Sequence, residues 1–122
     1  MRVSANLSVV ALGVGALVST GAPHAQTQVN FDSANHGSAA VSTSGAVTTV
    51  TTTNGTGTNY SSLNWGRFSI AAGDTVRFQQ PAVSSVSINR VVDPNPSVLA
   101  GTLSSNGRLI LVNPFGITVS AG

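Results

Sequence analysis

NGRLILVNPFGITV, residues 106–119, sets one short apolar run between two strong turn signals. Asn106-Gly107 precedes the apolar run at residues 109–112, and the tetrapeptide NPFG at residues 113–116 follows it. This tetrapeptide fits a type I turn at each position, because Asn caps with its side chain, Pro brings a preset φ and Gly ends the turn. We therefore interpret residues 109–112 as one short strand and the two turns as the corners at its ends.

The same arrangement of apolar pairs and turns recurs from residue 63 onward. Alternate positions along a strand lie on one face, so each pair indicates a strand with an inward apolar stripe. The pairs are Phe68/Ile70, Val76/Phe78, Val86/Ile88, Leu109/Leu111 and Ile117/Val119, and turn formers separate them at residues 72–74, 80–81, 93–96, 106–107 and 113–116. Such spacing is typical of a sandwich, a barrel or a solenoid.

The turn chemistry distinguishes these three architectures. An antiparallel sandwich needs two-residue hairpin turns, for which only Asn106-Gly107 is a good candidate. Several other turns contain Pro, which suits corners between short strands. No long 3.6-residue period follows the N-terminal apolar run, so few helices are expected. The sequence therefore predicts an all-β fold of the stacked β-helix type.

Residues 26–62 differ in composition from the rest. They are rich in Ser, Thr, Gly and Asn, and in isolation this segment is typical of flexible low-complexity sequence. The Val and Thr residues of VTTVTTT, residues 47–53, favour instead an edge strand with a polar face.

Charged residues are scarce, at 7% of the 122 residues against about 25% in an ordinary soluble domain. The cations are five scattered Arg, and the acids are three Asp. Binding to nucleic acid requires clustered cations, so no nucleic-acid partner is predicted. Cysteine is absent, and disulfides therefore contribute nothing.

The N-terminus has the pattern of a signal peptide. A positive start at Arg2 precedes the apolar run LSVVALGVGALV at residues 7–18, and a region of small residues follows to Ala25. The run is short for a membrane span. We predict a signal-peptide helix in residues 1–25, cleavage after Ala25 by the signal-peptide export machinery, and a single domain at residues 26–122. The mature protein would be exported through the periplasm to the cell surface or the medium.

Catalysis is not indicated. Only His36 remains after signal removal, and a hydroxyl nucleophile would also need a placed carboxylate. No nucleophile elbow, zinc-protease pair or phosphate-binding Gly loop is present. Polysaccharide lyases share the β-helix, but they typically use acids, Lys or Arg and bound calcium, which three scattered Asp suit poorly. We predict no enzyme activity, no metal and no cofactor.

Residues 64–119 resemble a known family. The matching features occur in order: Trp65, Phe68-Ser69-Ile70, Val76-Arg77-Phe78, Gln80-Pro81, Asn89-Arg90-Val91, Gly101, Leu103, Asn106-Gly107 and the Asn-Pro-x-Gly-Ile ending. This ordered set is similar to the N-terminal secretion domain of two-partner secretion exoproteins, the filamentous haemagglutinin family, whose domain is also called the haemagglutination activity domain. Two departures stand out: the family usually has Asn where Phe115 stands, and its Asn-Pro-Asn-Leu motif is absent.

The resemblance implies a right-handed parallel β-helix that serves export and nucleates folding of a large exoprotein at the cell surface. It implies a partner, a dedicated outer-membrane β-barrel transporter with periplasmic binding domains. The candidate secretion motif is Asn113, Pro114, Gly116 and Ile117, and the candidates for transporter recognition are Asn89 and Arg90. The alternative for all six is a purely structural role. The alternative function is an adhesin or structural surface module. Because the family's domain runs past Gly122, a partial exoprotein is expected.

Overall fold

The computed structural model describes residues 2–4, 7–11 and 26–120, and every regular element among them is a β-strand. The strands are β1 (Arg2–Ser4), β2 (Leu7–Ala11), β3 (Gln28–His36), β4 (Ser38–Ser44), β5 (Val47–Thr53), β6 (Tyr60–Ser69), β7 (Thr75–Gln79), β8 (Val86–Val91), β9 (Ser97–Leu99), β10 (Thr102–Ser105), β11 (Arg108–Asn113) and β12 (Ile117–Val119). They form sheet A (β1-β10-β7-β5-β4), sheet B (β2-β11-β8-β6-β3) and sheet C (β12-β9). The predicted all-β class is confirmed.

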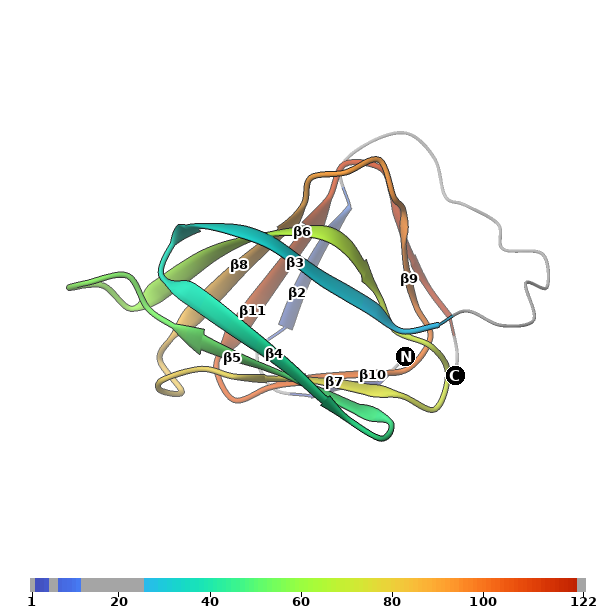
Figure 1. The fold of residues 1–122 in the computed structure, drawn as a ribbon, viewed down its shortest axis with the longest axis horizontal. Coiled ribbons are helices and arrows are strands. Elements are labelled where there is room, and N and C mark those ends of the chain that lie inside the picture. Colours follow the sequence, from blue (N-terminus) through green and yellow to red (C-terminus); the bar gives the residue numbers. More distant parts are fainter. Residues whose placement is uncertain (1, 5–6, 12–25, 121–122) are drawn as a thin grey trace.

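The chain visits the three sheets in a repeating order. β7, β8 and β9 lie in sheets A, B and C, and β10, β11 and β12 lie in the same three sheets again. Each later strand pairs in parallel with its predecessor, β10 with β7, β11 with β8 and β12 with β9. β5 and β6 precede them in the same way, in parallel with β7 and β8. Figure 1 shows the sheets on different sides of one shared interior.

The edge strands β3 of sheet B and β4 of sheet A are antiparallel to their neighbours. β4 pairs with β5, and β3 pairs with β6 across several register irregularities. Figure 1 shows β3 and β4 in front of the interior. The prediction of an edge strand at residues 47–53 is wrong, because β5 lies between β4 and β7. Its alternation explains the inner position, since Thr48, Val50 and Thr52 are buried while the intervening residues face outward.

Side chains from sheets A, B and C fill the core. The Trp65 ring lies edge-on to Phe68 and Phe78, with ring centroids 5.6 and 6.4 Å away. Edge-to-face pairs of this kind add to the stabilisation from burial. The buried apolar cluster consists of Val50, Leu63, Trp65, Phe68, Ile70, Val76, Phe78, Val91, Leu99, Leu103, Leu109 and Leu111. Three of the five predicted apolar pairs are therefore core pairs.

β8 reverses the expected polarity. Its inward residues are Ser87 and Asn89, both fully buried, whereas Val86 and Ile88 are half-exposed on the outer side. The expectation that this pair lines the core is wrong. Hydrogen bonds inside the fold satisfy the two polar residues, so an apolar inward stripe is not required. In β12, Ile117 packs on the core and Val119 is 53% exposed.

The N-terminal residues also differ from expectation. β1 and β2 are strands, so the predicted signal-peptide helix is wrong for residues 2–4 and 7–11. β1 pairs in parallel with β10, and β2 pairs in parallel with β11. The sequence LSVVA contains two adjacent valines, which favour strands. The two pairings also provide hydrogen-bond partners for backbone N–H and C=O groups along the edges of β10 and β11. Residues 12–25, including the predicted cleavage site, lie outside the described residues. No helix of the described chain has the length and apolarity to cross a membrane.

Candidate functional site

Asn113 holds the corner between β11 and β12. Its side chain is fully buried, and its Nδ2 donates to the Asn95 carbonyl at 2.8 Å and to Ser97 Oγ at 2.9 Å. Its Oδ1 accepts from the Phe115 N–H at 2.8 Å, and the Gly116 N–H donates to the Asn113 carbonyl at 3.1 Å. These bonds close the predicted turn and join it to the preceding corner at residues 93–96.

The other members of the candidate motif shape the same corner. Pro114 is exposed at the tip of the corner. Gly116 has a φ of 113°, a backbone conformation that residues other than glycine rarely adopt. Ile117 packs against the core and pairs with Ser97. The Phe115 ring is 41% exposed. The backbone of this corner therefore depends on Asn113 and Gly116, and the side chain at position 115 takes no part in the bonds that close it.

Asn89 is the centre of a buried hydrogen-bond network. Its Oδ1 accepts from Trp65 Nε1 at 2.9 Å, a contact between residues 24 apart in the sequence. Its Nδ2 lies within hydrogen-bond distance of the Ser87 carbonyl, Ser87 Oγ and the Ile110 carbonyl, at 3.1 to 3.3 Å. Asn89 therefore links β6, β8 and β11, three neighbouring parallel strands of sheet B.

Arg90 follows Asn89 directly and points the opposite way. It is exposed on the outer side of β8, in register with Asn64 on β6 and Val112 on β11. Strand alternation thus separates two neighbouring candidates, since Asn89 is internal and Arg90 is on the surface.

His36 has packing and hydrogen-bond partners. Its ring stacks on Tyr60 with centroids 4.2 Å apart, and its Nε2 lies 2.8 Å from Thr58 Oγ1. A side chain at Gly55 would collide with the ring, so the loop after β5 folds tightly around it. In the described part of the chain, no three His, Cys, Asp or Glu side chains group as metal ligands would.

The comparisons with known proteins identify the family. A family model described as the TPS (two-partner secretion) secretion domain matches residues 17–122, which is most of the chain. The chain belongs to the TPS secretion domain family. The predicted resemblance is therefore confirmed, and the role of this TPS domain is secretion targeting. This match favours secretion targeting over the alternative adhesin function.

Individual relatives agree with this family. The chain is 38% identical over 60 residues to a heme/hemopexin-binding protein of Haemophilus influenzae, and 35% identical over 66 residues to a second protein of that description. These matches cover 49% and 54% of this chain but 7% of each relative. The crystal structure of the HMW1 secretion domain from Haemophilus influenzae superposes with a TM-score of 0.67 at 30% identity, covering 76% of this chain and 24% of that one.

One structural unit of the TPS domain was missed from the sequence. Gln80 and Asn106 bond to each other twice, Gln80 N–H to Asn106 Oδ1 at 2.7 Å and Asn106 Nδ2 to the Gln80 carbonyl at 2.9 Å. Gln80 Nε2 also donates to Ser105 Oγ and the Arg108 carbonyl. Both residues were identified as turn formers, but not as partners. Their separation of 26 residues, close to that of Trp65 and Asn89, was the available signal.

Replacing Asn113 by alanine should lower the free energy of unfolding by about 2 kcal/mol, because the part-buried Phe115 N–H loses its acceptor and the Asn95 carbonyl and the buried Ser97 hydroxyl lose a donor. Phe115→Asn is the matched control at the same corner. This exposed position should change stability by less than about 0.5 kcal/mol. Urea unfolding of the full chain, followed by the fluorescence of its single Trp, measures both. Equal stability of N113A and the unmodified chain would contradict the assigned corner role.

Proposed function

We propose that residues 26–122 are part of the secretion domain of a large surface or secreted exoprotein, wound as a right-handed parallel β-helix. This winding is supported by one observation: the chain passes repeatedly through sheets A, B and C, and β10, β11 and β12 pair in parallel with β7, β8 and β9. In such a fold each coil rests on the previous one, so a folded first coil is a template for the next. The domain would nucleate folding of the exoprotein at the cell surface.

The proposed route begins in the cytoplasm of a Gram-negative bacterium. Residues 1–25 serve as the signal peptide, and cleavage follows Ala25. In the periplasm, binding domains of an outer-membrane β-barrel transporter receive the extended chain. Extended segments bind such domains by strand addition, in which backbone hydrogen bonds give affinity and side-chain pockets give specificity. The low content of charged residues and the absence of Cys suit a chain that crosses a membrane unfolded.

The six candidate residues divide by burial. Asn89 and Asn113 use their amide groups inside the fold, so their side chains reach a partner only before folding. Gly116 and Ile117 belong to the same corner, and we assign them to the fold. Arg90 and Pro114 are exposed and remain accessible in both states. We propose that Arg90 takes part in transporter recognition.

We assign no catalytic role to this chain. His36 is engaged by Tyr60 and Thr58 without a carboxylate in that cluster. The relatives named for heme and hemopexin binding are much longer than the part matched here. Any adhesive, toxic or ligand-binding activity of the whole exoprotein is therefore proposed to lie outside these residues.

The test is export of the epitope-tagged full chain from cells with and without the cognate transporter. The tag should reach the medium or the cell surface only when the transporter is present. A chain with the signal peptide but without residues 26–122 is the control and should stay in the periplasm. Release without the transporter, or binding of the purified chain to cells lacking it, would overturn the assignment and favour the adhesin alternative.

A further inference from the structure

The outer face of β8 and β11 carries an apolar strip. Ile88 is in register with Ile110, and Val112 and Val86 lie on the same outward side of the two strands. All four side chains are partly exposed, while the inward residues between them are buried. We call these four residues the outer strip.

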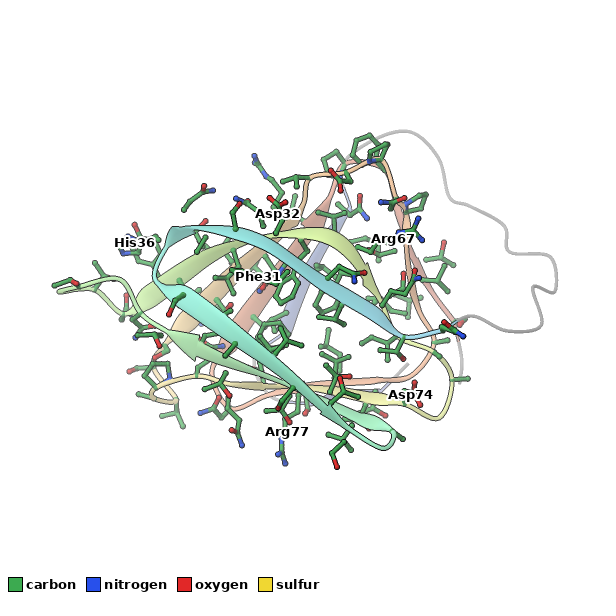
Figure 2. All side chains as sticks on the ribbon, in the orientation of Figure 1. Phe31, Asp32, His36, Arg67, Asp74 and Arg77 are labelled. Carbon is green, nitrogen blue, oxygen red and sulfur yellow. The ribbon has the colours of Figure 1, made fainter. Side chains whose placement is uncertain are left out.

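The outer strip gathers more apolar side chains than the outward face of sheet A does. The outward positions on sheet A are polar at Thr49 and Thr51 on β5, Arg77 and Gln79 on β7 and Ser104 on β10, and Val47 at the start of β5 is an apolar exception. Figure 2 shows Arg77 extending away from the sheet. β8 places Ser87 and Asn89 inside and its apolar side chains outside. Apolar side chains gathered on an exposed sheet face, next to polar side chains facing inward, indicate a surface that a partner covers.

Two cations flank the outer strip. Arg90 is in register with Val112, and Arg108 is in register with Val86, so one guanidinium group extends from each end of the face. Both are exposed, and neither β8 nor β11 contains an acidic residue. A second copy of this face would bring arginines toward arginines, which disfavours a symmetric dimer through it. A partner with carboxylates around an apolar surface is complementary in both respects.

We propose that the outer strip, with Arg90 and Arg108, is the surface that docks on the cognate transporter, whose contact surface is apolar with carboxylates at both edges. This inference rests on the proposed function. In the extended chain, residues 86, 88 and 90 lie on one side of their segment and residues 108, 110 and 112 lie on one side of theirs. Folding then brings the two sets together as β8 pairs with β11. Residues 87 and 89 then specify the fold, and residues 86, 88 and 90 specify the partner.

The test compares matched variants in the transporter-dependent export assay. Arg90→Gln with Arg108→Gln, and Ile88→Gln with Ile110→Gln, should each reduce export about tenfold, equivalent to losing about 1.4 kcal/mol of binding free energy. Arg77→Gln and Thr49→Gln, outward on sheet A, are the controls and should export normally. Trp65 fluorescence confirms that each variant folds. Should the isoleucine variant fail to fold, the arginine variant decides, because its side chains are exposed.

A photo-crosslinking residue at position 110, with position 49 as its control, identifies what covers the strip. A covalent adduct between position 110 and the transporter supports the proposal. An adduct with a second copy or with a later segment of the exoprotein overturns it, as does normal export of both double variants. These results leave the proposed function intact. If the unmodified chain is released without the transporter, the proposed function itself fails.

Discussion

The Asn89→Ala substitution is expected to lower the free energy of unfolding by about 3 kcal/mol. Asn89 accepts the Trp65 indole N–H and reaches acceptors on β8 and β11, all in the interior. Its removal leaves a buried indole donor without an acceptor, and the lost volume leaves a cavity between three parallel strands. A loss of this size is a large part of the stability of a small domain, typically 5–15 kcal/mol.

Arg90→Ala is the matched control for this prediction, one residue away on the same strand but exposed. It should change the free energy of unfolding by less than about 0.5 kcal/mol. Urea unfolding followed by circular dichroism compares the two variants, and Trp65 fluorescence should shift in N89A only. If both variants unfold at the unmodified midpoint, the network around Asn89 does not hold sheet B together.

Gly101→Ala is expected to destabilise the chain by about 3 kcal/mol, because no space exists for a Cβ before β10. An added Cβ would collide with the carbonyl oxygens of Ala71 and Asp74 and lie 2.6 Å from Ile70 Cγ2. The Asp74 carbonyl also accepts the Thr102 N–H at 2.9 Å, where β7 and β10 begin to pair. The clash can therefore be relieved only by a backbone shift, which would break the hydrogen bond between the Thr102 N–H and the Asp74 carbonyl.

Gly66→Ala is the comparison variant, at a glycine where an added Cβ meets only a movable side chain at close range. Its added Cβ would meet Asp93 Oδ2 at 3.0 Å, the far end of an exposed side chain that can rotate away. This variant should lose less than about 1 kcal/mol. Thermal unfolding of both full-length variants measures the difference. A G101A chain as stable as G66A would show that the β7–β10 spacing is not set by the glycine.

The corners were predictable from the sequence because their chemistry is local. The Asn113 turn follows from four adjacent residues, and its side-chain cap is formed within three of them. The all-β class followed from alternation and turn spacing. The position of β5 was not predictable in the same way, because a strand's neighbours depend on segments distant in sequence. Only β4, folded back on β5, places it inside the sheet.

The roles of the candidate residues were harder to predict from the sequence. Local pattern alone assigned Val86 and Ile88 to the core, yet the Trp65 indole N–H accounts for the inward Asn89. That contact joins β6 and β8, two strands whose residues are 24 positions apart. It therefore depends on a long-range pairing that neither local sequence shows. The strands at residues 2–4 and 7–11 were unexpected for a related reason, since an apolar run fits a helix or a strand equally well until its partner is known.

The attachment of β1 and β2 to β10 and β11 also affects the predicted mature protein. A cut after Ala25 would break the covalent link between β1 and β2 and the strands with which they pair. Their departure would leave β10 and β11 with rows of unshared peptide groups, the feature through which β proteins stick to one another. A mature chain that folds without β1 and β2 would therefore expose the edges of β10 and β11, and we expect such chains to aggregate through these edges.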